Sequence, residues 1–277
     1  MSAVPNIRLK NGVEIPQLGF GVFQIPPAET RAATLEALRV GYRHIDTAEM
    51  YGNEAEVAEG IRDSAIPRSE IFVTSKLNNG FHAHDAALKA FDRSLDLMKL
   101  EYLDLFLIHW PLPAVGDFVQ TWKAMEEIYA SGRVKAIGVS NFQTHHLDRL
   151  ARETGTVPAV NQIEIHPYFN QAELRAYDAA RGIATEAWSP IAQGQVLDDP
   201  VVVAIARRLG RSAAQVTLRW HIQLGNIVFP KSVTPARIAE NFALFDFELT
   251  DADMAAITGL HRDGRRGPNP DEFNWIP

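Results

Sequence analysis

The sequence predicts a parallel α/β protein, and more specifically a (β/α)8 TIM barrel. Eight short apolar segments alternate with amphipathic helical segments, which is the pattern of repeated strand–helix units. An open nucleotide-binding sheet usually carries a G-x-G-x-x-G turn after its first strand, but here Gln24 follows Gly19 and Gly21 at the last glycine position. The strand count and the missing fingerprint favour a closed barrel. Because such barrels run to roughly 250 residues, we expect a single domain over residues 1–277.

The chain opens with a predicted β-hairpin. Two short apolar segments, Ile7–Leu9 and Val13–Ile15, flank the dipeptide Asn11-Gly12. That dipeptide suits a tight turn with positive φ, so we expect the two segments to pair before the barrel begins.

The eight barrel strands are expected where short apolar runs end in a polar residue. They are Leu18–Phe20, Arg43–Asp46, Ile71–Lys76, Leu103–His109, Val134–Ser140, Ala159–Ile163, Ala184–Trp188 and Ile227–Phe229. The fourth is almost wholly apolar before its end, which is typical of a strand buried on both faces of a parallel sheet.

Helices are expected between these strands. They cover Ala28–Val40, Glu54–Ser64, His84–Met98, Val119–Ala130, His145–Glu153 and Gln171–Arg181. Two helical patterns, Val201–Leu209 and Ala213–Leu224, follow the seventh strand, another helix opens near Thr234-Pro235, and a last one covers Asp251–Gly259. The barrel should therefore carry extra helices after strand seven and at the C-terminus.

Composition narrows the function. The chain has 27 Lys and Arg against 34 Asp and Glu, a net charge of −7, which argues against binding nucleic acid or an anionic membrane. It has no cysteine, which excludes disulfides, cysteine metal sites and thiol nucleophiles. No apolar run approaches the roughly 18 residues of a membrane span, and we see no signal peptide. We therefore expect a cytoplasmic globular protein.

Side chains able to react or to bind a ligand stand at the ends of the predicted strands, where barrel enzymes place their active sites. They are Asp46, Lys76, His109, Ser140, Asn141, Gln162, Trp188 and Lys231. Asp46 and Lys76 on neighbouring strands can form an ion pair, and the charge of Lys76 would lower the pKa of a nearby Tyr51. A phenol tuned in this way is a useful general acid near neutral pH, and His109 could orient a carbonyl oxygen.

Other interpretations of these residues stay open. Asp46 and Lys76 could be a purely structural ion pair, or Lys76 could form a Schiff base as in an aldolase. Ser140 lacks a G-x-S-x-G elbow, so a hydrolase is disfavoured. The pairs His82/His84 and His145/His146 lie near predicted helix starts without a third ligand, so we expect solvated surface there and no metal.

A second cluster, from Pro230 to Arg237, predicts a phosphate site. Thr234 can cap the helix that Pro235 opens, and the free N–H groups of a helix start favour an anion. Lys231, Ser232 and Arg237 gather at that end. An ordinary capped helix with surface cations is the alternative.

A planar ring with an amide could bind beside this cluster. Trp188 could stack on such a ring, and Ser140, Asn141 and Gln162 could hydrogen-bond a carboxamide. A nicotinamide has both features. Taken singly, Trp188 is better explained by core packing and the three polar residues by strand-end capping. Their combination with the phosphate site favours the nicotinamide.

Several long motifs resemble those of the aldo-keto reductases, and the resemblance runs from about Ile7 to Thr258. The motifs are Gly41-Tyr42-Arg43-His44-Ile45-Asp46-Thr47-Ala48, Tyr51-Gly52-Asn53-Glu54, Thr74-Ser75-Lys76-Leu77, Leu107-Ile108-His109-Trp110-Pro111, Ile137-Gly138-Val139-Ser140-Asn141-Phe142, Asn161-Gln162-Ile163-Glu164-Ile165-His166-Pro167 and Pro230-Lys231-Ser232 with Arg237, Glu240 and Asn241. Short loops and Trp188 make the chain look most similar to the bacterial group that includes 2,5-diketo-D-gluconate reductases.

The resemblance implies a (β/α)8 barrel that reduces a small aldehyde, dicarbonyl or keto-sugar with NADPH, as a monomer. It implies a catalytic tetrad of Asp46, Tyr51, Lys76 and His109, in which Tyr51 donates the proton, Lys76 with Asp46 lowers its pKa and His109 positions the carbonyl. The cofactor would contact Gly21, Val22, Asp46, Ser140, Asn141, Gln162, Trp188, Ser189, Lys231, Ser232, Val233, Arg237, Glu240 and Asn241. A barrel that binds NADPH without catalysis is the rival from another class.

Three positions depart from the family pattern. Asn78 stands where many relatives carry a Trp, Glu49 replaces a residue that is usually small, and Thr234 replaces a basic residue of some bacterial relatives. The first two bear on the substrate pocket. We expect its wall to comprise Phe23, Met50, Tyr51, Asn78, His109, Trp110 and the tail around Phe273–Trp275.

Overall fold

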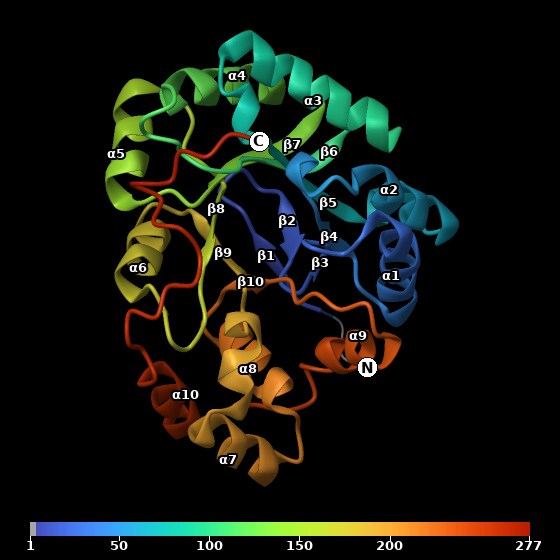
Figure 1. The fold of residues 1–277 in the computed structure, drawn as a ribbon, viewed down its shortest axis with the longest axis vertical. Coiled ribbons are helices and arrows are strands. Elements are labelled where there is room, and N and C mark those ends of the chain that lie inside the picture. Colours follow the sequence, from blue (N-terminus) through green and yellow to red (C-terminus); the bar gives the residue numbers. More distant parts are fainter. Residues whose placement is uncertain (1–3) are drawn as a thin grey trace.

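The computed structural model describes residues 4–277 and shows a barrel of parallel strands surrounded by helices (Figure 1). Its strands are β3 (Phe20–Gly21), β4 (His44–Asp46), β5 (Phe72–Leu77), β6 (Leu103–Ile108), β7 (Val134–Ser140), β8 (Val160–Glu164), β9 (Ala184–Trp188) and β10 (Ile227–Val228). Each pairs in parallel with the next along the chain in one eight-stranded sheet. The predicted (β/α)8 architecture is confirmed.

The segment before β3 closes the sheet against the last strand. Leu18 forms a parallel bridge with Val228. The N–H of Gly19 donates to the Val228 carbonyl (2.9 Å), and the N–H of Val228 donates to the Gln17 carbonyl (3.0 Å). These bonds satisfy backbone groups that an open sheet would expose at its two edges.

The helices pack around the strands, and most of their bounds lie within one or two residues of the prediction. They are α1 (Pro27–Val40), α2 (Glu54–Asp63), α3 (His84–Met98), α4 (Phe118–Ala130), α5 (Thr144–Glu153), α6 (Ala172–Ala180), α7 (Pro200–Leu209), α8 (Ala213–Gln223), α9 (Pro235–Phe242) and α10 (Asp251–Thr258). After α10 the chain passes α6 and α5 and, in the view of Figure 1, ends beside β7 on the inner side of α4.

Four 3-10 helices were not predicted. They cover Glu49–Tyr51, Arg68–Glu70, Asn79–Phe81 and Ala192–Asp198. Three of them are single turns with too few residues for an apolar repeat, and the fourth is interrupted at Gln193 and Gly194, so the sequence carries no periodic signal for them. The first of them matters for function because it ends at Tyr51.

The predicted hairpin is present, and it closes the N-terminal end of the barrel. Strand β1 (Asn6–Arg8) pairs antiparallel with β2 (Glu14–Pro16), and Gly12 takes the expected positive φ of 89°. Ile15 is fully buried in one apolar cluster with Leu105 and Ile227 from the barrel interior. The hairpin thus blocks the end of the barrel opposite to the strand ends that carry the polar residues.

A second apolar core lies between the strands and the helices. Phe106 of β6 and Phe91 of α3, both fully buried, contact each other with ring centroids 5.1 Å apart. Helix α3 presents Leu95 to this core, whereas Leu97 on the same helix is 52% exposed. In the described part of the chain, no helix is both long and apolar enough to span a bilayer.

These two leucines allow a matched test of the packing. Leu95→Ala should lower the free energy of unfolding by about 2–5 kcal/mol, because it removes buried methyl groups and leaves a cavity. Leu97→Ala should change it by no more than about 0.5 kcal/mol, since leucine and alanine both favour helix and the site is exposed. Urea denaturation of both variants measures the difference. Similar losses at the two positions would contradict the placement of α3.

A buried carboxyl group joins three elements on the same side of the barrel. Glu54, the first residue of α2, is 1% exposed and accepts hydrogen bonds from Ser75 Oγ of β5 (2.5 Å) and Ser94 Oγ of α3 (3.3 Å). Burial raises the pKa of Glu54 to about 7, although the two serine hydroxyls oppose the shift. The Glu54 carboxyl is therefore largely protonated in the folded protein below neutral pH.

This carboxyl should make stability depend on pH. The folded protein holds the Glu54 proton up to about pH 7, whereas the unfolded chain releases it near the usual value of 4.5. Stability should therefore be fully present below about pH 4.5 and fall between there and pH 7, by at most about 1 kcal/mol per pH unit, relative to Glu54→Gln. Chemical denaturation at several pH values gives the difference. Glu59→Gln, on the exposed face of the same helix, controls for loss of a carboxylate, and a wild-type minus Glu54→Gln difference that is constant with pH would refute the expectation.

Candidate active site

The structure brings Asp46, Lys76 and Tyr51 together at the C-terminal end of the barrel. Lys76 Nζ lies 2.8 Å from Asp46 Oδ1, and it also donates to the Thr47 carbonyl (2.9 Å) and to Tyr51 Oη (3.3 Å). Asp46 ends β4 and Lys76 lies near the end of the adjacent strand β5, so the parallel register sets their distance. Lys76 is fully buried and Asp46 is 3% exposed, so this ion pair is shielded from water.

Tyr51 reaches the pair from a loop, and His109 lies across from it. The 3-10 turn Glu49–Tyr51 ends at Gly52, whose φ of 68° lies in the left-handed region that glycine tolerates. The Tyr51 ring contacts His109 edge-on at 5.7 Å and Phe23 at 4.9 Å between ring centroids. The four residues expected to form a catalytic tetrad therefore share one site.

The partners of Lys76 decide its protonation. Burial acts to lower its pKa, but Asp46 and Tyr51 outweigh it, so the pKa of Lys76 is raised. Lys76 is therefore an ammonium ion at neutral pH. A Schiff-base lysine must be a free amine, so the aldolase alternative gains no support from this geometry.

The expectation that the pKa of Tyr51 lies below its usual value is wrong for this structure. Burial raises the pKa of Tyr51, and the positive charge of Lys76 opposes the shift without cancelling it. Desolvation penalises the phenolate more than one neighbouring cation stabilises it, because Asp46 offsets part of that cation's field. Tyr51 is thus a neutral phenol that retains its proton.

His109 is uncharged as well. Burial, with a smaller contribution from Lys76, lowers the pKa of His109 well below its usual value. Its Nδ1 is buried and has no hydrogen-bond partner among residues 4–277. A neutral imidazole can donate one hydrogen bond without carrying charge into the site.

Sequence reasoning missed a second carboxyl group beside the ion pair. Gln162 Nε2 donates to Asp46 Oδ2 and to Glu186 Oε2, both at 2.8 Å. Glu186 is fully buried, and burial together with the nearby Asp46 raises its pKa to about 8. Alternate residues of a strand share one face, so Glu186 faces the same way as Trp188. A charged residue inside a buried strand was the signal that could have identified it.

Ser140, Asn141 and Trp188 form a connected network. Asn141 Nδ2 donates to the His109 carbonyl and to Ser140 Oγ, both at 3.0 Å, and Ser140 Oγ donates to the Gln162 carbonyl at 2.9 Å. The indole Nε1 of Trp188 donates to Asn141 Oδ1 at 2.8 Å. The side-chain N–H groups of Asn141 and Gln162 are therefore already used, and these two amides offer oxygen acceptors to a ligand.

The phosphate cluster presents two cations at the start of α9. Lys231 and Arg237 are both exposed, and neither forms an ion pair or hydrogen bond within the described chain. The prediction that the Thr234 side chain caps the helix is wrong: it makes no cap bond, and Ser232 Oγ instead accepts from the Thr234 N–H at 3.1 Å. Ser232 lies two residues before the N-cap position Thr234, so its bond orders the turn that carries the cations and does not cap the helix.

The remaining residues expected to bind a cofactor lie on both sides of these clusters. The N–H of Val22 donates to the Asp46 carbonyl (3.2 Å) and that of Gly21 to the Pro230 carbonyl (3.3 Å). Ser189 follows Trp188 with a φ of 50°. Val233 and Glu240 are exposed, Asn241 is half-buried, and Glu240 Oε1 accepts from Ser212 Oγ at 2.7 Å.

The expected pocket wall is only partly open. Phe23 and Trp275 are 54% and 53% exposed, whereas Trp110 is 8% exposed because Phe273 of the tail covers it, with ring centroids 4.3 Å apart. Met50 and Asn78 are half-buried. The tail reaches the loop after β5 through Asn79 Nδ2, which donates to the Trp275 carbonyl at 2.9 Å.

The two unusual residues Glu49 and Asn78 contact each other. Burial raises the pKa of Glu49, and the Arg93 guanidinium and the backbone N–H of Asn78 oppose the shift. Arg93 Nη2 lies 3.5 Å from Glu49 Oε1. The two departures from the family pattern thus belong to one polar contact between neighbouring loops.

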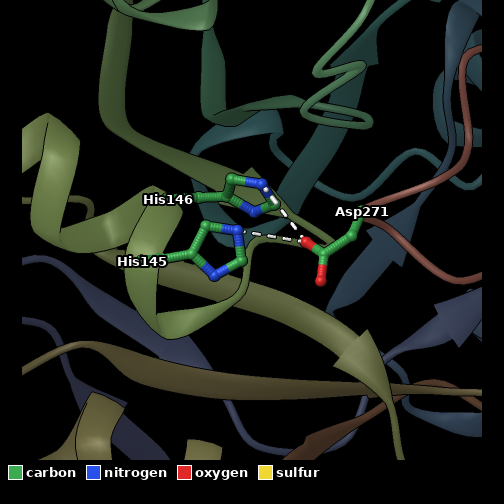
Figure 2. Close-up of side chains that lie close together, drawn as sticks. All are labelled: His145, His146 and Asp271. Carbon is green, nitrogen blue, oxygen red and sulfur yellow. Dashed lines mark ion pairs between the residues drawn. The ribbon is translucent and has the colours of Figure 1, made fainter.

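The histidine pairs are less exposed than expected. His82 and His146 are 7% and 3% exposed, so the prediction of solvated surface is wrong for one histidine of each pair. Figure 2 shows Asp271 of the tail beside the rings of His145 and His146, and Asp271 Oδ1 lies 3.1 and 3.5 Å from their respective Nε2 atoms. The His146 Nδ1 accepts from the Gln143 N–H at 3.1 Å, so neutral His146 carries its proton on Nε2 and points it at Asp271. That proton favours a hydrogen-bonded tether of the tail over a metal ligand at Nε2.

A cavity of about 810 Å³ lies at the other end of the barrel. It is lined by residues of the hairpin and of the strand starts, including Glu14, Arg43, Asp104 and Lys135. None of the residues at the strand tops borders it. The strand tops are the candidate active site because the buried ion pair, the neutral phenol and the imidazole meet there.

Comparisons with known proteins agree with this arrangement. The model of the Aldo/keto reductase family matches residues 17–262. An aldo-keto reductase from Mycolicibacterium smegmatis is 53% identical over 271 residues, 98% of this chain and 98% of that protein. Glyoxal reductase from Bacillus subtilis is 47% identical over 268 residues, 96% of each chain.

A solved structure matches this chain along nearly the whole length of both proteins. It is a mutant of the protein Gox0644 in complex with NADPH, with a TM-score of 0.95 and 46% identity, and the match covers 99% of this chain and 100% of that one. The chain therefore belongs to the aldo/keto reductase family and is an NADP-dependent oxidoreductase that acts on carbonyl groups.

Proposed function

We propose that this protein reduces aldehydes and ketones to alcohols with NADPH, and that Tyr51 is the proton donor. The observation that carries the proposal is the contact of Tyr51 Oη with the buried Lys76–Asp46 ion pair. A phenol that holds its proton at neutral pH, beside a fixed positive charge, is suited to protonate an oxygen that becomes negative during the reaction.

The residues present fit NADPH at both ends. Two cations without carboxylate partners, Lys231 and Arg237, are suited to a 2′-phosphate. The half-buried face of Trp188 and the oxygen acceptors of Asn141 and Gln162 are suited to the nicotinamide ring and the amino group of its carboxamide. When bound, NADPH supplies the hydride that reduces the carbonyl carbon.

The protein side chains move the proton and hold the charges. Tyr51 gives up the proton on Oη, and the Lys76 ammonium, 3.3 Å away, stabilises the phenolate that remains. Asp46 keeps Lys76 charged and fixed. Neutral His109 donates a hydrogen bond to the carbonyl oxygen, which orients the substrate without adding a second cation.

We infer that the substrate is a small aldehyde, dicarbonyl or keto-sugar. The similarity to glyoxal reductase supports a small dicarbonyl. The resemblance of the short loops and Trp188 to 2,5-diketo-D-gluconate reductases is the ground on which we extend the proposal to keto-sugars. Phe23, Met50, Asn78, Trp110 and Trp275 would form the pocket wall, with Phe273 narrowing it by covering Trp110. We further expect one domain, a monomer and a cytoplasmic location, which gel filtration and cell fractionation can examine.

Tyr51→Phe should separate chemistry from binding. We expect kcat to fall by about 10²–10⁴-fold, because the ring remains but the transferable proton is gone. The dissociation constant for NADPH should stay within about twofold of the wild-type value, since in the proposed mechanism the Tyr51 hydroxyl contacts the substrate carbonyl and not the cofactor. Turnover with a panel of aldehydes and dicarbonyls, together with calorimetric titration, measures both. Tyr129→Phe, on helix α4, is the matched control, and normal turnover by Tyr51→Phe would refute the mechanism.

Arg237→Ala should reveal the phosphate site through a change in cofactor preference. A charge-assisted bond to phosphate contributes about 1.5–3 kcal/mol, so NADPH binding should weaken by roughly 10–100-fold while NADH binding changes little. Arg152→Ala, an exposed arginine on α5, controls for the loss of a surface charge. Equal losses of affinity for the two cofactors would show that Arg237 does not contact the 2′-phosphate.

A further inference from the structure

The C-terminal segment reaches the cofactor site at Gly267. A Cβ built on this residue would lie 2.4 Å from Cη2 and 3.3 Å from Cζ2 of Trp188, and 3.1 Å from Glu164 Oε2. The φ of Gly267 lies outside the left-handed region, so its backbone conformation does not require glycine. The requirement comes from the closeness of the Trp188 ring.

Glu164 holds this part of the tail in place. It ends β8, is 1% exposed, and accepts from the N–H groups of Arg266 (2.6 Å) and Gly267 (2.8 Å) through its two oxygens. His166 Nε2 lies 2.8 Å from Oε1. Burial acts to raise the pKa of Glu164, but His166 and the two backbone N–H groups outweigh it, so the pKa is lowered and the group is a carboxylate.

Trp188 is thus held from two directions. Its Nε1 donates to Asn141 Oδ1, and Gly267 lies against its benzo end. Upstream, the N–H of Gly264 donates to the Tyr168 carbonyl at 2.9 Å, so the tail cannot slide away along its own direction without losing bonds. Downstream, Gln143 Nε2 donates to Asp271 Oδ2 at 2.8 Å.

We propose that Gly267, clamped by Glu164, is a positioning residue that sets the plane of the Trp188 ring and thereby the affinity for the nicotinamide half of NADPH. This inference rests on the proposed role of Trp188 as the surface on which the nicotinamide stacks. Planar stacking depends steeply on ring position, because a gap of less than 1 Å already forfeits a large part of the contact energy. A small tail residue far from the strand tops in sequence therefore acts on cofactor binding through an aromatic ring.

Two ligands distinguish this role from general damage. Gly267→Ala should weaken NADPH on the order of tenfold, because overpacking shifts the ring. Binding of 2′-phosphoadenosine diphosphoribose, which lacks the nicotinamide, should stay within about twofold. Gly155→Ala, whose Cβ would meet Glu126 Oε1 at an ordinary 3.6 Å, should change neither affinity. Isothermal titration of the full chain measures all of them, and equal losses for both ligands would overturn the proposal.

The double variant Gly267→Ala/Trp188→Phe tests whether the loss of NADPH affinity acts through Trp188. Phenylalanine lacks the benzo end of indole, so in a Trp188→Phe background Gly267→Ala should cost no further affinity for NADPH. An undiminished cost in that background would overturn the proposal. If Gly267→Ala alone fails to fold, Gly267→Ala/Trp188→Phe should restore the fold, and a failure to restore it would count against the clash.

The outcomes also separate this inference from the proposed function. A wild-type protein that binds no NADPH would refute the proposed function itself. A wild-type protein that binds and oxidises NADPH, with Gly267→Ala indistinguishable from it, would refute only the role of Gly267.

Discussion

The ion pair of Lys76 and Asp46 is the constraint around which the rest of the site is arranged. A fully buried ammonium ion is stable only when its charge and its donors are satisfied, because transfer of an ion out of water costs several kcal/mol. Here Asp46, the Thr47 carbonyl and Tyr51 Oη take the three donors of Lys76 Nζ. All three partners come from β4 or the loop after it, so a single strand-to-strand register fixes the whole arrangement.

Burial, modified by the charges of that pair, sets the protonation of its neighbours. Glu186 has a raised pKa of about 8 because it is buried beside Asp46, and it remains mostly protonated at neutral pH. The pKa of His109 is lowered by burial and by Lys76, and the pKa of Tyr51 is raised by burial. The site therefore combines one cation and one anion with three neutral groups. Negative charge that develops on a substrate oxygen has one fixed positive charge nearby to stabilise it.

Much of the fold was predictable because each strand and helix carries its own pattern. Strand β7, strand β9 and helix α3 have the predicted bounds, since apolar runs and helical periodicity reflect local burial. The meeting of Asp46, Lys76 and His109 was predictable for a related reason: a parallel barrel brings successive strand ends to one rim. These three residues meet because each stands at the end of a barrel strand, and no specific contact is needed to predict it.

The net effect of burial and neighbouring charge on a pKa was not predictable in the same way. The sequence indicates that Lys76 lies near Tyr51, but the sign of the pKa shift of Tyr51 depends on how deeply the ring is buried. The same holds for the start of α9, where the Thr234 side chain makes no cap bond and the Thr234 N–H donates to Ser232 Oγ. Propensity allows Thr234 to cap a helix, and the path of the turn decides whether its side chain does so.

The tail after α10 differs from the strand ends because it is not part of the repeated strand–helix units, so the barrel does not fix its position. Each of its contacts is an individual match: Gly267 with Trp188, Asp271 with Gln143, Phe273 with Trp110 and the Trp275 carbonyl with Asn79. The backbone of the tail does not join the sheet, so these individual contacts hold it on the barrel. It touches the aromatic surface at the cofactor end and the pocket wall at the substrate end. In the proposed function, the strand tops carry the carbonyl chemistry, and the tail shapes the place where substrate and cofactor meet.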